Sequence, residues 1–91
     1  MKLRQLVREI HWIEWQLRTF EDKYSILSRD FYQAMESGQL SDFDDGEEPH
    51  FHDFIEWHAL YKIWLKREQV YRETLHQRPL PEQLQYATTA A

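Results

Sequence analysis

Apolar side chains recur at steps of three and four residues through the start of the chain, and this spacing constrains the fold most strongly. Such a step matches the roughly 3.6-residue turn of an α-helix and places the apolar positions on one face. A helix is therefore predicted from Lys2 to about Lys23, a rod of roughly 30 Å. The positions on this face are Leu3, Leu6, Val7, Ile10, Ile13, Leu17, Phe20 and Tyr24.

Two further helices are expected. A short helix from Arg29 to Ser37 would be capped by the hydroxyl of Ser28 and would end at Gly38 in the left-handed conformation. A long helix would carry Pro49 in its first turn, where the missing proline N–H costs nothing, and would continue to about His76. Its apolar stripe consists of Phe54, Trp57, Tyr61, Trp64, Tyr71 and Leu75, with Leu60 and Leu65 at the edges.

These elements predict an all-α domain over residues 1–78, with two long helices and one short helix joined by an acidic loop. Two Gly, three Pro and the absence of an alternating β-branched run leave little material for strands and turns. Pro79 and Pro81 stop the last helix, so residues 79–91 are expected to form a flexible C-terminal tail.

Fourteen aromatic residues are many for a chain of 91, whose core must be thin. Trp12 and Trp15 lie off the apolar face of the first helix. A second, weaker stripe lies opposite the aromatic face of the last helix. Since tryptophan is enriched at binding hot spots, we expect dimerisation or a partner to complete the bundle. The alternative is that the monomer buries these residues itself. The second stripe contains Ile55, Ala59, Ile63 and Val70.

Charge is distributed unevenly along the chain, whose net charge is −5. Between Asp30 and Tyr61 there is no Lys or Arg, although this stretch holds nine of the 16 acidic residues. An acidic centre attracts a basic protein and repels nucleic acid, although a solvated loop could have the same composition. The basic side chains elsewhere form no continuous stripe for nucleic acid. The acidic residues predicted to contact a partner are Asp42, Asp44, Asp45, Glu47 and Glu48.

Histidines beside these acids raise the question of a metal site. His50 and His52 would point about 200° apart if both lay on a helix, so they could share an ion only if His50 preceded it. An EF-hand loop starting at Asp42 would need its glycine one residue later than Gly46. We therefore predict no metal site and no cofactor. The absence of cysteine excludes disulfides and zinc–thiolate sites.

No residue spacing links a nucleophile to a base. Arg72 and His76 are similar to the Arg/His pair of some helical ribonucleases, but are one residue closer together. A small Arg/His or metal-dependent nuclease is thus an alternative, although i,i+4 pairs are common on helix surfaces. The N-terminal stretch MKLRQLVREIHWIEW carries charges every few residues, so we expect neither a signal peptide nor a membrane span, and a cytoplasmic location.

One part of the chain, from Lys23 to Trp57, carries a pattern of basic, small, acidic and aromatic residues. The residues that form it are Lys23-Tyr24, Ser28, Phe31, Gly38-Gln39-Leu40, Asp42 and Asp53-Phe54-Ile55-Glu56-Trp57. This pattern resembles that of small bacterial and archaeal proteins that read K-Y-G-M-S-S-x-E-F, then G-E-L-G-D-D, then D-F-x-E-W. Here Ser25 replaces the glycine, Asp30 replaces the glutamate, and the loop is longer around FDDGEEPH.

Many proteins of that family resemble antitoxins encoded beside a small toxin of ribonuclease type. The resemblance implies a non-enzymatic interaction protein that binds and masks a basic toxin. The charge distribution favours the same function, because a ribonuclease must be basic to hold RNA. A self-associating structural protein with no catalytic role is a further alternative.

Overall fold

A computed structural model of the chain describes residues 3–43, 46–77, 80–82 and 84–85. All the regular secondary structure in these ranges is helical, which confirms the predicted all-α class. Residues 80–82 and 84–85 also have helical backbone, so the boundary of a flexible tail stays a prediction. The main elements are α1 (Leu3–Tyr24), α2 (Ser28–Glu36), the 3₁₀ turn η1 (Ser41–Phe43) and α3 (Phe51–Gln77).

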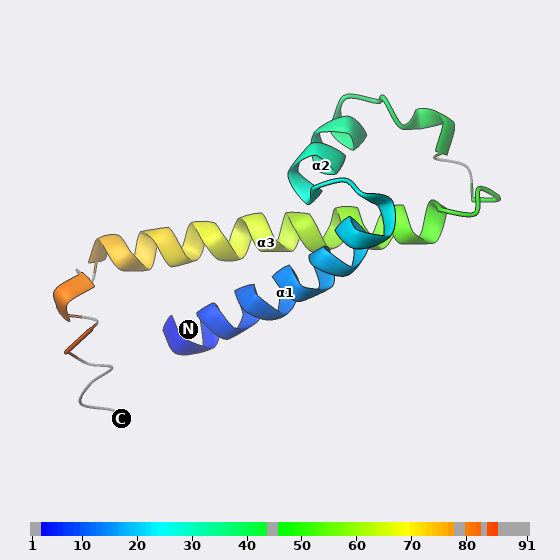
Figure 1. The fold of residues 1–91 in the computed structure, drawn as a ribbon. Helices are drawn as coiled ribbons and strands as arrows, with labels where there is room; N and C mark the ends of the chain where they lie inside the picture. The colour runs from blue at the N-terminus through cyan, green and yellow to red at the C-terminus, as the bar shows by residue number, and fades with distance from the viewer. Residues whose placement is uncertain (1–2, 44–45, 78–79, 83, 86–91) are drawn as a thin grey trace.

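The helices form an elongated molecule of 53 × 23 × 20 Å (Figure 1). α1 and α3 run antiparallel and pack along each other, and α2 lies across the end where α1 stops and α3 starts. The last turns of α3 extend beyond the first turn of α1 (Figure 1). Three elements therefore meet at one end of the molecule, whereas the other end has two helices at most. In the part of the chain that the structure describes, no helix has both the length and the apolar character needed to cross a bilayer.

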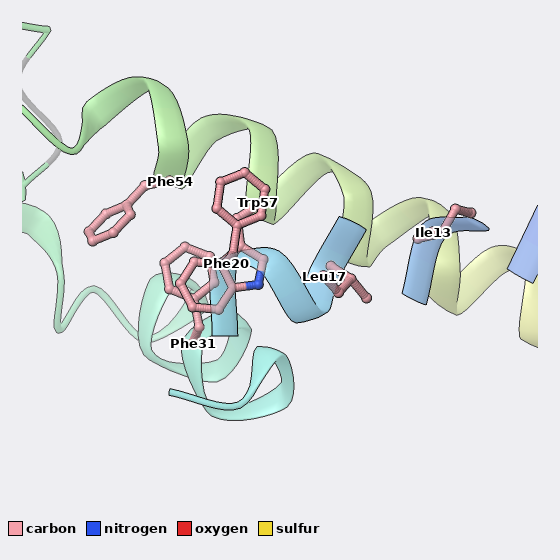
Figure 2. Close-up of a cluster of buried hydrophobic side chains, with 6 residues drawn as sticks. All are labelled: Ile13, Leu17, Phe20, Phe31, Phe54 and Trp57. Carbon is pink, nitrogen blue, oxygen red and sulfur yellow. The ribbon is translucent and has the colours of Figure 1, made fainter. Parts of the chain in front are cut away.

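The core lies at the end where the three helices meet (Figure 2). Its buried side chains come from the predicted apolar stripes, and the whole stripe of α1 is buried or half-buried. Burial decreases along α3: Phe54 and Trp57 are buried, Tyr61 and Trp64 are half-buried, and Leu65 is exposed. The predicted stripe of α3 is thus fully covered only where α2 packs against it. The core cluster consists of Ile13, Leu17, Phe20, Phe31, Phe54 and Trp57.

The expected end of α2 is confirmed, but its expected cap is not. Gly38 has φ +80°, and its N–H and that of the next residue return to carbonyls of the last turn, at 3.3 and 3.0 Å. Ser28 is already inside α2, and Leu27 precedes the helix without a side-chain cap. The Ser28 N–H donates instead to Glu21 Oε2 at 2.9 Å, so a carboxylate of α1 replaces the cap.

The start of α3 also differs from the prediction. The helix begins at Phe51, two residues after Pro49. Pro49 is the second residue of a turn that the Phe51 N–H closes on the Glu48 carbonyl at 3.0 Å. Proline is favoured at this turn position for the same reason that favours it in a first helical turn, because its φ is fixed. The sequence alone therefore could not distinguish a turn that precedes the helix from the first turn of the helix.

Ser25, which ends α1, has φ 57°, in the left-handed region that favours glycine. A non-glycine residue in this conformation destabilises the folded state by about 1–2 kcal/mol. Glycine avoids this strain, but its greater conformational freedom in the unfolded state offsets part of the gain. We expect Ser25→Gly to stabilise the fold by roughly 0.5–1 kcal/mol in urea denaturation. The matched control is Ser37→Gly, at φ −85°, which should destabilise it. A loss of stability in Ser25→Gly would contradict this prediction.

Candidate functional site

Several residues of the stretch from Lys23 to Trp57 come together at the junction of α1, α2 and α3. Trp57 lies at the centre with no exposed surface. Its ring stacks on Phe31, with centroids 3.8 Å apart and planes 3° from parallel, and also stacks with Phe20 and Tyr24. Phe54 meets Phe31 edge-on at 5.1 Å (Figure 2). These aromatic residues, all but Phe20 from the stretch between Lys23 and Trp57, thus form the centre of the core.

Ser28 completes this core as a polar partner. It is buried, and its Oγ accepts a hydrogen bond of 2.8 Å from Trp57 Nε1. A buried indole N–H without a partner would be costly, so this small hydroxyl lets a tryptophan occupy the centre. The Ser28 hydroxyl, which was predicted to cap α2, therefore accepts a hydrogen bond from α3 instead.

A polar network borders the junction on its solvent side. Asp53 Oδ2 accepts hydrogen bonds of 2.5 Å from both Lys23 Nζ and Tyr24 Oη. Tyr24 Oη also lies 3.0 Å from His50 Nδ1. Because the Tyr24 hydroxyl has one proton and donates it to Asp53, His50 must donate from Nδ1. We call these four residues the junction network; they connect the last turn of α1 with the start of α3.

The junction network holds its ionisable groups in the forms they already adopt at neutral pH. The hydrogen bond from Lys23, with that from Tyr24, lowers the pKa of Asp53. The bond to Asp53 raises the pKa of Lys23, and burial raises the pKa of Tyr24. The pKa values of Asp53, Lys23 and Tyr24 therefore move away from neutrality. A general acid or base works best with a pKa near the operating pH, so this arrangement is typical of a structural network.

Asp53 is expected to make stability depend on pH on the acid side. Its folded pKa is lowered, so its contribution is complete above the unfolded value near 3.8 and is lost as the pH falls through the folded value. We expect Asp53→Asn to lower the free energy of unfolding at pH 7, and this difference from wild type to shrink below about pH 4. Denaturation at pH 7, 5 and 3 measures it. Asp22→Asn, which alters an exposed carboxylate nearby, is the control; an equal effect there would contradict the prediction.

The two histidines do not converge on a metal site. His50 does precede α3, which is the arrangement that would have allowed a shared ion, but its Nδ1 is bound to Tyr24. His52 is exposed in the first turn of α3. Within the described ranges, no group of three or more His, Cys, Asp or Glu side chains could hold a metal ion.

The pair expected for a nuclease lies in the last turns of α3. Arg72 Nη2 pairs with Glu68 Oε1 at 3.4 Å, one turn earlier, and His76 is exposed. Arg72 also borders a shallow groove between α1 and α3, beside His11 and Glu14. Glu14 accepts a hydrogen bond from Trp64 Nε1 at 3.1 Å. The groove thus holds two carboxylates beside Arg72, those of Glu14 and Glu68, which do not favour binding of a phosphate.

The acidic segment gathers at the end of the molecule where the three helices meet. It forms α2, the loop with η1 and the first turns of α3 (Figure 1). Asp42 and Glu47 are exposed and Glu48 is half-buried, while Asp44 and Asp45 lie outside the described residues. We call the exposed acids of this segment the acidic end. It comprises Asp30, Asp42, Glu47 and Glu56.

Two other acids of the segment are bound internally. Asp53 belongs to the junction network. Glu36 Oε1 lies 2.8 Å from His58 Nε2, and this hydrogen bond lowers the pKa of Glu36. Glu36, although exposed, and Asp53 are therefore not counted in the acidic end.

The apolar residues expected at an interface are exposed. Trp12 and Trp15 are 59% and 64% exposed, and Ile55, Ile63 and Val70 are 39–48% exposed. The monomer therefore does not bury them. At about 100° per residue, each group lies on the side of its helix turned away from the α1–α3 interface. They therefore form two separate surfaces.

Sequence reasoning missed the junction network and the Ser28–Trp57 bond. Asp53 lies about thirty positions after Lys23 and Tyr24 in the sequence, and no local pattern connects it to them. The sequence analysis also did not identify Leu27 as an exposed apolar residue; its exposed fraction is 65%.

Comparison of the chain with protein-family models, with curated proteins and with solved structures finds no match.

Proposed function

We propose that this chain is a non-enzymatic interaction protein that binds a basic partner at its acidic end, as an antitoxin that masks a ribonuclease-type toxin. The observation that carries the proposal is the segregation of charge. Asp30, Asp42 and Glu56 are exposed and make no ion pair within the described part of the chain. The surface around them comes from a stretch of 32 residues that has no Lys or Arg.

Such a surface suits a partner that must bind RNA. A ribonuclease presents a positively charged surface to phosphates, and carboxylates at the end of a helical bundle can bind that surface in their place. The acidic end is built on α2, η1 and α3, so its carboxylates are partly ordered before the partner arrives. Preorganisation lowers the entropy lost on binding. The proposal requires no cofactor and places the protein in the cytoplasm with its partner.

The ionisable clusters support a non-catalytic role over the nuclease alternative. The junction network moves the pKa values of Asp53 and Lys23 away from neutrality, and Arg72 is paired with Glu68. Neither arrangement presents a base and a free cation to the same substrate. We further propose that another chain covers the exposed apolar surfaces and completes the bundle.

Co-expression with the product of the neighbouring gene tests the antitoxin role. The partner should co-purify, and growth arrest caused by it should be relieved. Charge reversal at the acidic end, Asp42→Lys with Glu56→Lys, should abolish both effects. Glu73→Lys with Glu82→Lys makes the same change in net charge on exposed residues near the other end, and should leave both effects intact.

Two results would overturn the proposal. One is absence of co-purification at low salt together with unrelieved growth arrest. The other is RNA cleavage by the purified protein that is lost in Arg72→Ala, which would establish the nuclease alternative.

A further inference from the structure

The solvent-facing side of α1 carries a stripe of exposed residues that the proposed partner at the acidic end does not use. Their steps of three and four residues place them on one face of the helix, opposite the core. We call this set the α1 stripe. It consists of Arg4, Arg8, Trp12, Trp15, Thr19 and Asp22, all of them exposed.

The acids of α1 that could neutralise the stripe are engaged elsewhere. Glu9 pairs with Arg67 at 3.0 Å, Glu14 accepts from Trp64, and Glu21 accepts from the Ser28 N–H. Arg4 and Arg8 make no ion pair in the described ranges. The stripe therefore runs from a positive end, through two tryptophans, to a negative end.

This order makes the stripe complementary to itself. The point between Trp12 and Trp15 is also the midpoint of the helix Leu3–Tyr24. When a second α1 is laid antiparallel across that point, Trp12 faces Trp15 and Arg8 faces Thr19. Arg4 faces Lys23, whose charge is bound by Asp53, and lies one residue from Asp22. A parallel pairing would set Arg4 against Arg4 and Asp22 against Asp22, which repel.

We propose that a second copy of this chain covers the α1 stripe, with the two α1 helices packed antiparallel about a two-fold axis between Trp12 and Trp15. Such an isologous contact is the commonest way in which soluble proteins dimerise. The tryptophans lie at its centre, where hot-spot residues concentrate, and the charged residues lie at its rim. The acidic end is left free, so this proposal is independent of the proposed partner.

The size of the contact predicts a weak dimer. An aromatic side chain buries about 150–250 Å², so the exposed parts of four tryptophans supply roughly 350–650 Å². Stable interfaces bury about 1,200 Å² or more, and the stems of Arg4 and Arg8 with Thr19 must supply the remainder. The dimer should therefore dissociate on dilution and weaken in high salt.

Analytical ultracentrifugation over a range of concentrations is the first test. Wild type should shift from the 11.3 kDa monomer to twice that mass. Trp12→Ala with Trp15→Ala should raise the dissociation constant at least about tenfold without loss of helical content, because both residues are exposed. Ile55→Ala with Ile63→Ala, on the exposed side of α3, is the matched control and should dimerise like wild type.

The direction of pairing is tested by cross-linking, since the chain has no cysteine. Arg8→Cys and Thr19→Cys should form a disulfide when the two variants are mixed. Each variant alone should cross-link poorly, because its two cysteines would lie roughly 16 Å apart along the helices, beyond the reach of a disulfide. Efficient cross-linking of each variant alone would show a parallel pair and would overturn the proposal.

Three other results would also overturn it. These are a monomer at all concentrations, a dimer that only the α3 control disrupts, and a monomer that binds single-stranded RNA or anionic vesicles through Trp12 and Trp15. A charge cycle gives independent support. Arg4→Asp and Asp22→Arg should each weaken the dimer, and the double variant should restore it, because the opposite charges then meet again.

Discussion

Trp57→Ala is expected to lower the free energy of unfolding by about 3–5 kcal/mol, which would leave much of the protein unfolded. Trp57 is fully buried and contacts aromatic residues of α1, α2 and α3 at once. Its removal leaves a cavity among Phe20, Phe31 and Phe54. A thin core offers few other side chains to fill that space.

Urea denaturation followed by far-ultraviolet circular dichroism measures this loss. The control is Trp15→Ala at concentrations where the protein is monomeric, since Trp15 is 64% exposed. It should change stability by less than about 0.5 kcal/mol. Similar losses in the two variants would mean that the junction is not the centre of the core.

Ser28→Ala is expected to cost about 1–3 kcal/mol, the penalty for leaving a buried donor without a partner. Ser28 is only 3% exposed, and its hydroxyl is the acceptor for Trp57 Nε1. The control is Ser37→Ala, an exposed serine that bonds the Ala34 carbonyl of its own helix. That substitution should be nearly neutral.

A double-mutant cycle separates this hydrogen bond from packing. In a Trp57→Phe background the ring has no N–H, so Ser28→Ala should cost clearly less than it does in wild type. An equal cost in both backgrounds would assign the effect of Ser28→Ala to packing or helix propensity and would contradict the prediction.

Local periodicity determined the helices of this protein. The steps of three and four residues predicted α1 and most of α3 and identified the stripe from Leu3 to Tyr24 that the fold buries or half-buries. Gly38 was recognised as the end of α2 because a left-handed residue is required there whatever packs around it. These features depend on neighbours in sequence, so the sequence alone is sufficient to predict them.

The tertiary structure decided what each polar residue of the junction does. Ser28 was a suitable helix cap by local rules, but a tryptophan twenty-nine positions away takes its hydroxyl. Asp53 and His50 were indistinguishable from the other charged residues near the start of the predicted long helix until the fold brought Lys23 and Tyr24 to them. Likewise, only the fold showed that the two exposed apolar groups face opposite ways. Contacts between distant segments depend on how whole helices pack, and this information is spread over the entire chain rather than held in any short pattern.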